Sequence, residues 1–488
     1  MKQSGILLHI SSLNTEYGIG DLGSEAYVFA DYLVQNGHSF WQILPLNHPG
    51  YGNSPYNPIS AFAGNPYLIS PELLIKDGLL KNNEVIRLPK AWKIDFESVY
   101  KAKDTMLKIA ANRFLECHNI DEYIEEKAYY IKAYTSFLFL TESYGHSNWQ
   151  KWDTAHKSYN DKLFKDIIKE PRAREIAAIQ AIFDEQLSRL KEHVTSQGIK
   201  IIGDVPLYLS YESAEVWAFQ ELFDLDDEGM RQSFAGVPPD AFSDEGQLWG
   251  NPIYLWEKME EDGFELFMRR FASALEFVDL LRLDHFIGYV NYWKVPLIDK
   301  VEPKDAKEGS WVKASPKAFF EELNRRFLKE RFIAEDLGIL NDEVCHYRDK
   351  YSLPGMIVLQ FCFDDGVQDI SRFPKNRIIY TGTHDNNTSI GWFRSLPDDS
   401  QTRLNLEQFC KEYLPEKQLP TEDNIHEIMA DIARLSGCKT MILPMQDILG
   451  LDESHRMNTP GTPTGNWDWR MNIPAKDIEE HTKAQKMR

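Results

Sequence analysis

Four acidic residues in this sequence stand at the ends of short apolar runs. They are Asp204 in GDVPLY, Asp284 in RLDHF, Glu335 in IAEDLG and Asp385 in GTHDNN. For each residue taken alone, a helix cap or an ion pair explains its position equally well. If all four converge in one cleft they cannot all stay ionised at low cost, so at least one should act as a proton donor. Paired carboxylates of this kind are the machinery of glycosidic bond cleavage.

An arginine accompanies one of these carboxylates on the same strand. Arg282 and Asp284 are two residues apart in DLLRLDHFIGY, so a strand points both side chains to one face. Buried charges are costly unless they are paired, and the guanidinium should keep Asp284 ionised as a nucleophile. Glu335 follows the apolar residues RFIA, which favour its protonated form and an acid/base role.

Eight short apolar runs, separated by helical patterns, define the elements that must carry these residues. They lie at 5–10, 40–46, 199–208, 277–284, 331–336, 355–361, 377–385 and 439–447. Near-continuous apolar strands between helices are typical of a parallel sheet covered on both faces. A doubly wound open sheet is the alternative, but polar residues at the ends of many different strands favour a (β/α)8 TIM barrel, an α/β fold with all its loops around one mouth.

The spacing of the runs predicts insertions into a single catalytic barrel domain that spans residues 1–488. Residues 70–172, after the second strand, carry long helical patterns and are expected to form a helical insertion. Residues 209–276 contain FAGVPPDAFSDEGQLWGNPIY, whose Gly, Pro and acidic residues predict a loop-rich insertion over the barrel mouth.

Other residues have competing interpretations. GIGDLG at 18–23 satisfies the GxGxxG dinucleotide pattern, but Asp21 would place a negative charge where a pyrophosphate must lie. His285 and His384 could be metal ligands, yet no third ligand stands at suitable spacing, so we expect donors to a neutral polar ligand and no metal. Tyr51, Tyr56 and Trp249 could pack loops, or their rings could stack on sugar faces.

Composition narrows the class of partner. The formal charge of -21 repels phosphate backbones and anionic lipids, so nucleic acid and membrane surfaces are not expected partners. Five scattered cysteines without CxxC spacing argue against a disulfide framework or a zinc site. No run approaches the ~20 apolar residues of a membrane span, and the amino-terminal run is too short for a signal peptide. We therefore expect a soluble cytoplasmic protein.

The whole chain resembles a known enzyme family. The matching stretches, in order along the chain, are GILLHISSL, YGIGDLG, WQILPL, GYGNSPY, SAFAGNPYLIS, GDVPLY, GVPPDAFSDEGQLWGNPIY, RLDHF, IAEDLG, GTHDN and NTPGTPTGNWDWR. Together they are similar to the 4-alpha-glucanotransferases, the amylomaltase or disproportionating enzymes of the alpha-amylase-like clan. The resemblance implies a (β/α)8 barrel with inserted subdomains that transfers α-1,4-glucan segments to the 4-hydroxyl of glucose or another glucan, without a cofactor.

The resemblance also implies a role for each site residue. Asp284 is expected to be the nucleophile, Glu335 the general acid/base and Asp385 the carboxylate that stabilises the transition state. The substrate-binding residues that it implies are Tyr51, Tyr56, Asp204, Asp240, Trp249, Arg282, His384 and Asn466. A retaining mechanism requires that the carboxyls of Asp284 and Glu335 lie ~5 to 5.5 Å apart.

The sequence departs from the family pattern at two positions, and two other functions compete with this interpretation. Isoleucine follows His9 where the family usually has proline, and Ala241 stands where many members have tyrosine, which bears on acceptor size. An α-glucan hydrolase would use the same carboxylates, because only exclusion of water separates the two reactions. A non-catalytic glycan-binding scaffold is disfavoured by the intact carboxylates. Oligomeric state and preferred chain length are left open.

Overall fold

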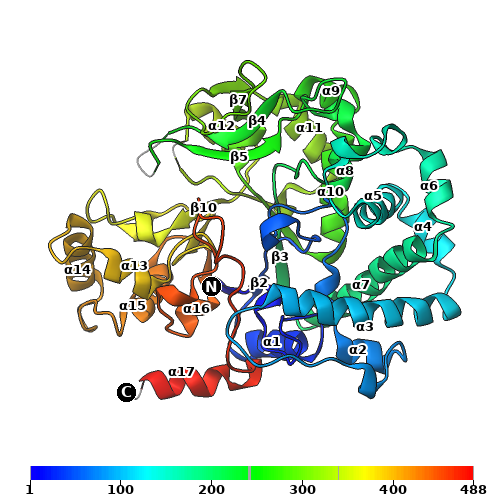
Figure 1. Cartoon of the computed structure of the whole chain (residues 1–488). Helices are drawn as coiled ribbons and strands as arrows, with labels where there is room; N and C mark the ends of the chain where they lie inside the picture. The colour runs from blue at the N-terminus through cyan, green and yellow to red at the C-terminus, as the bar shows by residue number, and fades with distance from the viewer. Residues whose placement is uncertain (1, 240–242, 339, 487–488) are drawn as a thin grey trace.

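The central element of the protein is a parallel barrel. The computed structural model describes residues 2–239, 243–338 and 340–486. Among these residues, eight parallel strands surround the molecular centre (Figure 1). They are β1 (Gln3–Leu7), β2 (Phe40–Gln42), β3 (Lys200–Val205), β6 (Leu280–Leu283), β9 (Phe332–Ala334), β10 (Gly355–Val358), β11 (Arg377–Tyr380) and β12 (Thr440–Pro444). Each strand overlaps one of the eight apolar runs, and the predicted (β/α)8 fold is confirmed.

Backbone hydrogen bonds close the sheet on itself. The strand order is β10-β11-β12-β1-β2-β3-β6-β9, which leaves β9 and β10 at its two edges. The Ala334 N–H donates to the Pro354 carbonyl at 2.8 Å and joins these edges. Ile6, Ile202 and Leu281 are fully buried, as expected for strands that face a core on one side and helices on the other.

Helices fill the long interval between β2 and β3. Residues 70–172 contain α2 (Pro71–Lys76), α3 (Phe96–Cys117), α4 (Ile120–Glu126), α5 (Ile131–Tyr144) and α6 (Asp161–Ile167). They are followed by α7 (Pro171–Ser196), which packs on α3 and α5 and leads back into β3 (Figure 1). The division of the chain into domains stays a prediction.

A second, antiparallel sheet lies beside the barrel mouth, at the top of Figure 1. Its order is β5-β4-β7-β8, formed by β4 (Ser233–Val237), β5 (Gln247–Pro252), β7 (Asn291–Pro296) and β8 (Ser310–Lys313). Two of these strands, β4 and β5, belong to the segment 209–276, which is thus more regular than its Gly- and Pro-rich sequence indicates. It also holds α8 (Ala214–Ala218), α9 (Trp256–Glu261) and α10 (Glu265–Phe277). Asp240 and Ala241 lie outside the described residues.

The carboxy-terminal third packs as a second apolar cluster against β10, β11 and β12. Its helices include α13 (Ser389–Ser395), α14 (Gln401–Tyr413) and α15 (Ile425–Leu435). Phe393, Phe409 and Ile432 are fully buried between these helices and the barrel. None of the described helices is long and apolar enough to cross a membrane.

Candidate active site

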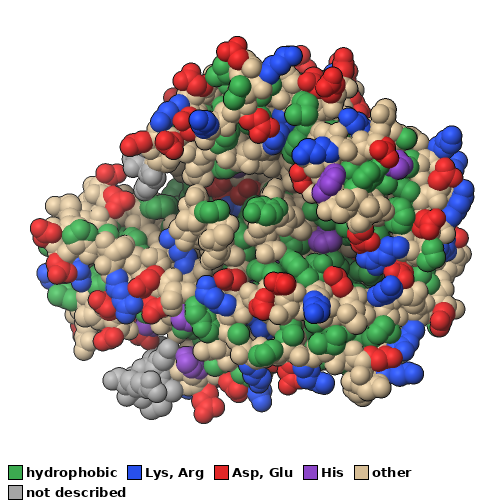
Figure 2. Space-filling model, viewed as in Figure 1, with side chains coloured by type: hydrophobic (Ala, Val, Ile, Leu, Met, Phe, Trp, Pro, Cys, Tyr) green, Lys and Arg blue, Asp and Glu red, His purple; other side chains and the backbone are tan. Residues whose placement is uncertain are grey.

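The predicted catalytic carboxylates occupy the carboxyl ends of neighbouring barrel strands. Figure 2 shows a hollow in this face of the molecule with acidic side chains on its floor. Strand register explains the grouping, because Asp204 on β3 pairs with Arg282 on β6, and Leu283 pairs with Ala334 on β9. Asp284 and Glu335 directly follow this last pair, so the adjacent strands β6 and β9 place the two carboxylates side by side.

Arg282 is the cation around which three carboxylates gather. Its Nη1 lies 2.7 Å from Asp204 Oδ2 and 2.8 Å from Asp284 Oδ1, and its Nη2 lies 4.0 Å from Glu335 Oε2. The side chains of Arg282 and Asp204 are buried. One positive charge cannot balance three negative charges in a poorly solvated site, so protons must be held there.

Glu335 is the carboxyl on which a proton is held most strongly. Burial raises its pKa to about 8, and the nearby Arg282 only partly opposes this shift. Its oxygens accept hydrogen bonds from the backbone N–H groups of His285, at 2.8 Å, and Leu337, at 3.1 Å. Glu335 is 13 % exposed, whereas Asp284 is 25 % exposed and directly paired with Arg282. This asymmetry suits Glu335 to donate a proton and Asp284 to attack.

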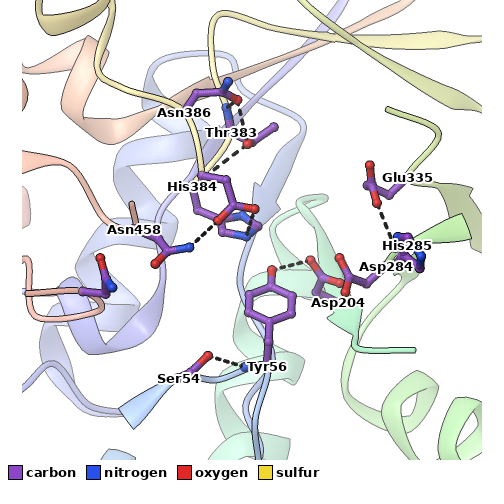
Figure 3. Close-up of polar contacts among 12 residues, drawn as sticks. Ser54, Tyr56, Asp204, Asp284, His285, Glu335, Thr383, His384, Asn386 and Asn458 are labelled. Atoms are coloured by element: carbon purple, nitrogen blue, oxygen red, sulfur yellow. Dashed lines mark hydrogen bonds and ion pairs between the residues drawn. The ribbon is translucent and has the colours of Figure 1, made fainter. Parts of the chain in front are cut away.

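Asp385 is held as an anion by His384 and Asn458, which Figure 3 shows on the other side of the Tyr56 ring from Asp204. Asn458 donates from Nδ2 to Asp385 Oδ1 at 2.6 Å, and His384 Nε2 lies 3.3 Å from Asp385 Oδ2. Desolvation opposes ionisation, but His384 and the Asn458 amide outweigh it and hold the pKa of Asp385 well below its usual range. Arg456 donates to the Asp385 carbonyl and fixes the backbone.

Tyr56 connects the two sides of the site. Figure 3 shows its ring between Asp204 and His384. The hydroxyl donates to Asp204 Oδ2 at 2.9 Å, and the ring stacks on His384 with a centroid distance of 5.0 Å and an interplanar angle of 14°. Trp467 packs against both rings at 5.7 and 5.9 Å. A rigid, half-buried aromatic wall results.

The remaining predicted binding residues lie at the rim. Trp249, on β5, is 38 % exposed and meets the His285 ring edge-on at 4.8 Å. Asn466 stabilises its own loop, because it accepts from the Thr459 N–H and donates to the Thr462 carbonyl. Tyr51 is 95 % exposed, and no hydrogen bond or ring contact joins it to the described residues of the site. Asp240 lies outside the described residues.

Sequence reasoning missed two residues of this site. Asn458, which binds Asp385, and Trp467, which packs on Tyr56 and His384, both follow β12 and reach the site from the end of the chain. The available signal was the motif NTPGTPTGNWDWR, which begins at Asn458 and includes Trp467.

The GIGDLG segment has a different explanation from nucleotide binding. Asp21 accepts the N–H of Gly23, the residue that precedes helix α1 (Ser24–Gln35), at 2.9 Å. Its other oxygen lies 3.6 Å from Nζ of the buried Lys103. The carboxylate therefore occupies the position that a phosphate would need.

The fold and the site together define a (β/α)8 enzyme of the class that cleaves glycosidic bonds with carboxylates. The family model described as 4-alpha-glucanotransferase matches residues 8–475. A 4-alpha-glucanotransferase of Aquifex aeolicus is 40% identical, covering 96% of this chain and 96% of its own length. Another, of Thermus thermophilus, is 38% identical, covering 98% and 96%.

A solved structure agrees with these sequence matches. The amylomaltase from Streptococcus agalactiae in complex with acarbose superposes with a TM-score of 0.90 at 32% identity, covering 100% of this chain and 99% of that one. The chain belongs to the 4-alpha-glucanotransferase family, as its motifs predicted, and its activity is the transfer of glucan segments.

Proposed function

We propose that Asp284 is the nucleophile of this transfer, Glu335 its general acid/base and Asp385 the carboxylate that stabilises the transition state. The observation that carries the assignment is the asymmetry around Arg282. The guanidinium pairs directly with Asp284 at 2.8 Å, while burial favours the protonated form of Glu335. An ionised carboxylate and a protonated carboxyl on adjacent strand ends are the two reactants that the chemistry needs.

The reaction has two displacement steps. In the first, the Glu335 proton passes to the glycosidic oxygen while an Asp284 oxygen attacks the anomeric carbon, which releases one glucan and leaves a covalent β-glucosyl ester. In the second, ionised Glu335 removes the proton from the 4-hydroxyl of an acceptor glucan, whose oxygen displaces Asp284. Two inversions give net retention, and the ester preserves the energy of the donor linkage, so no cofactor is needed.

The substrates that we propose are α-1,4-glucans, such as maltooligosaccharides and fragments of starch or glycogen. Arg282, Asp204, Tyr56 and His384 form the floor and wall around the reacting sugar. At the rim, Trp249 offers an exposed ring, and Asn466, Tyr51 and Asp240 are assigned to the outer glucan path. The acarbose bound to the Streptococcus agalactiae amylomaltase, a structure that superposes on the whole chain, supports a saccharide in this groove.

The retaining mechanism predicts a separation of ~5 to 5.5 Å between the carboxyls of Asp284 and Glu335 in a ligand complex. The ion pairs of both carboxyls with one guanidinium support a short separation. A separation in the range of inverting enzymes, ~6.5 to 9.5 Å, would contradict the assignment of Asp284 as nucleophile.

The test is incubation with maltotriose, with chromatography of the products and a count of total reducing ends. Transfer gives a ladder of longer oligosaccharides plus glucose at a constant number of reducing ends. Asp284→Asn, Glu335→Gln and Asp385→Asn should each lower kcat by about 10³-fold or more, and the exposed Asp399→Asn is the matched control. Rising reducing ends without a ladder would establish a hydrolase instead.

We also propose a reducing, cytoplasmic location. All five cysteines are free thiols, and three of them, Cys362, Cys410 and Cys438, are buried. A reducing compartment preserves such thiols. Cell fractionation with an antibody against the chain tests this, and recovery in an oxidising compartment would contradict it.

A further inference from the structure

A small cavity is lined in part by His384, the neighbour of Asp385 in the candidate active site. Its volume is about 20 Å³, which is enough for one water molecule. Its lining residues come from the ends of β1 and β12, from the segments that follow β2 and β11, and from the carboxy-terminal segment: Leu7, Leu8, His9, Leu44, His384, Pro444, Gln446, Met457 and Trp469.

Two polar atoms on the lining side chains have no hydrogen-bond partner among the described residues. They are Nδ1 of His9 and Nε1 of Trp469, both without accessible surface. His9 is 7 % exposed and Trp469 1 % exposed, so bulk solvent cannot satisfy them. Native proteins satisfy such atoms with ordered water when the space allows it.

The two atoms are chemically complementary through a water molecule. The indole N–H of Trp469 can only donate a hydrogen bond. Burial lowers the pKa of His9 to about 3, so its ring is neutral and one ring nitrogen accepts. A water oxygen can accept from Trp469 while one of its hydrogens is donated to His9, which accounts for both atoms at once.

We infer that this cavity holds a water that bridges Trp469 Nε1 and His9 Nδ1, and that His9 and Trp469 are thereby positioning residues for His384. His384 is the wall that the cavity and the active site share. One face of its ring stacks on Tyr56, and its Nε2 lies 3.3 Å from Asp385 Oδ2. His9 and Trp469 line the same cavity as His384, so a water that fixes their side chains also fixes this wall and keeps His384 aligned with Asp385.

This inference rests on the proposed role of Asp385, but the water bridge has a test that does not use activity. In protein labelled with ¹⁵N tryptophan, the indole N–H signal that disappears in Trp469→Phe belongs to Trp469. His9→Leu removes the acceptor and should move this signal, whereas His9→Asn, whose carboxamide oxygen can accept from the water, should leave it close to its original position. Equal shifts in both variants, or no shift in either, would overturn the bridge.

The positioning role is tested by transfer kinetics on maltotriose. We expect His9→Leu and Trp469→Phe each to lower kcat about tenfold or more with a smaller change in KM, because a displaced group costs most in the transition state. His9→Asn should recover most of this loss. Trp217→Phe is the matched control, since it removes a buried indole hydrogen bond to the His156 carbonyl in the helical insertion and should leave kcat unchanged.

The outcomes separate this inference from the proposed function. Wild-type kcat in both His9→Leu and Trp469→Phe, with an inactive Asp385→Asn, would overturn the positioning role and leave the proposed function standing. A fully active Asp385→Asn would remove the proposed role of Asp385 and the positioning role with it. The bridge itself would still be decided by the indole signal of Trp469. If His9→Leu fails to fold, Trp469→Phe supplies the kinetic test.

Discussion

At the scale of single residues, the acid/base role proposed for Glu335 predicts how the transfer depends on pH. Its carboxyl must carry a proton to protonate the leaving oxygen, and burial raises its pKa to about 8. We therefore expect kcat/KM to be steady below that pH and to fall about tenfold per pH unit above it. Initial rates of transfer from maltotriose, at low substrate and across pH 6 to 10, measure this limb.

The acidic side of the pH profile of kcat/KM provides a control on the assignment of Glu335 as the general acid. Asp385, whose pKa is held well below its usual range, should stay ionised and should not limit the rate near neutral pH. Enzyme held at each pH and returned to pH 7 must regain full activity, so that unfolding is not mistaken for titration. If kcat/KM instead falls with rising pH at a midpoint below pH 6, Glu335 is not the acid, because its pKa is about 8.

Glu335 is also predicted to cost the protein stability. The folded pKa of about 8 lies above the ordinary 4.5, so between these values the folded state binds a proton that the unfolded state has lost. Stability must then fall as pH rises through this window. Glu335→Gln cannot titrate and should be more stable than wild type at pH 8 by on the order of a few kcal/mol, while being inactive.

Urea unfolding at pH 5 and pH 8 measures this effect. The stability difference between Glu335→Gln and wild type should grow with pH, because only in the wild type does a buried carboxyl that resists ionisation oppose folding. The loss of one of the two backbone N–H contacts, from His285 or Leu337, reduces the gain equally at both pH values. The exposed Glu330→Gln serves as the control. A difference that does not change with pH would rule out a raised pKa.

At the scale of elements, the turn after β6 depends on an unusual backbone conformation. His285 has φ 49 and ψ 56, in the left-handed region, and this conformation points its N–H at Glu335. Glycine adopts that region freely, whereas alanine pays about 1 kcal/mol. His285→Gly should therefore be more stable than His285→Ala, although both lose the ring contact with Trp249.

Thermal or urea unfolding of the two variants decides this prediction. The matched control is Lys108, an exposed residue inside helix α3, where the order should reverse because glycine is about 1 kcal/mol worse than alanine in a helix. If His285→Ala equals or exceeds His285→Gly in stability, the left-handed conformation is not what the turn requires.

The barrel could be predicted from the sequence because its strands are local signals. Each is a short apolar run, such as the one that contains Ile201 and Ile202, and the carboxylates follow directly from these runs. The antiparallel sheet could not be predicted in this way. Strands β4 and β7 pair with each other although α9, α10 and β6 lie between them in the sequence. Strands β5 and β8 consist mostly of partly or fully exposed residues, with no regular apolar pattern. Such pairing depends on tertiary context rather than local pattern.

In the candidate site, too, some contacts could be predicted from local sequence patterns and others could not. Arg282 and Asp284 could be paired from a spacing of two on one strand, whereas the contact of Asn458 with Asp385 joins residues 73 positions apart. Trp467 reaches Tyr56 from a left-handed backbone conformation, with φ 65, that no local pattern predicts. Contacts made by irregular segments after the last strand are set by the assembled barrel.

At the scale of the whole molecule, a strongly acidic protein acts on a neutral substrate. The charge of -21 makes the folded chain repel itself, and added salt screens this repulsion over a Debye length of about 10 Å at 0.1 M. A glucan carries no charge, so the same field neither attracts nor repels it. Stability and catalysis should therefore respond differently to ionic strength.

We expect Tm to rise as NaCl increases from about 20 to about 300 mM, while kcat/KM for maltotriose changes less than about twofold. Differential scanning fluorimetry and initial transfer rates in the same buffers measure the two quantities, and KCl in place of NaCl controls for effects of a particular cation. The ion pairs of Arg282 lie within the barrel mouth and are shielded from these ions, so catalysis is not altered through them. A steep fall of kcat/KM with salt would mean that dissolved ions act on the charges of the active site, and would contradict the shielding of the Arg282 ion pairs.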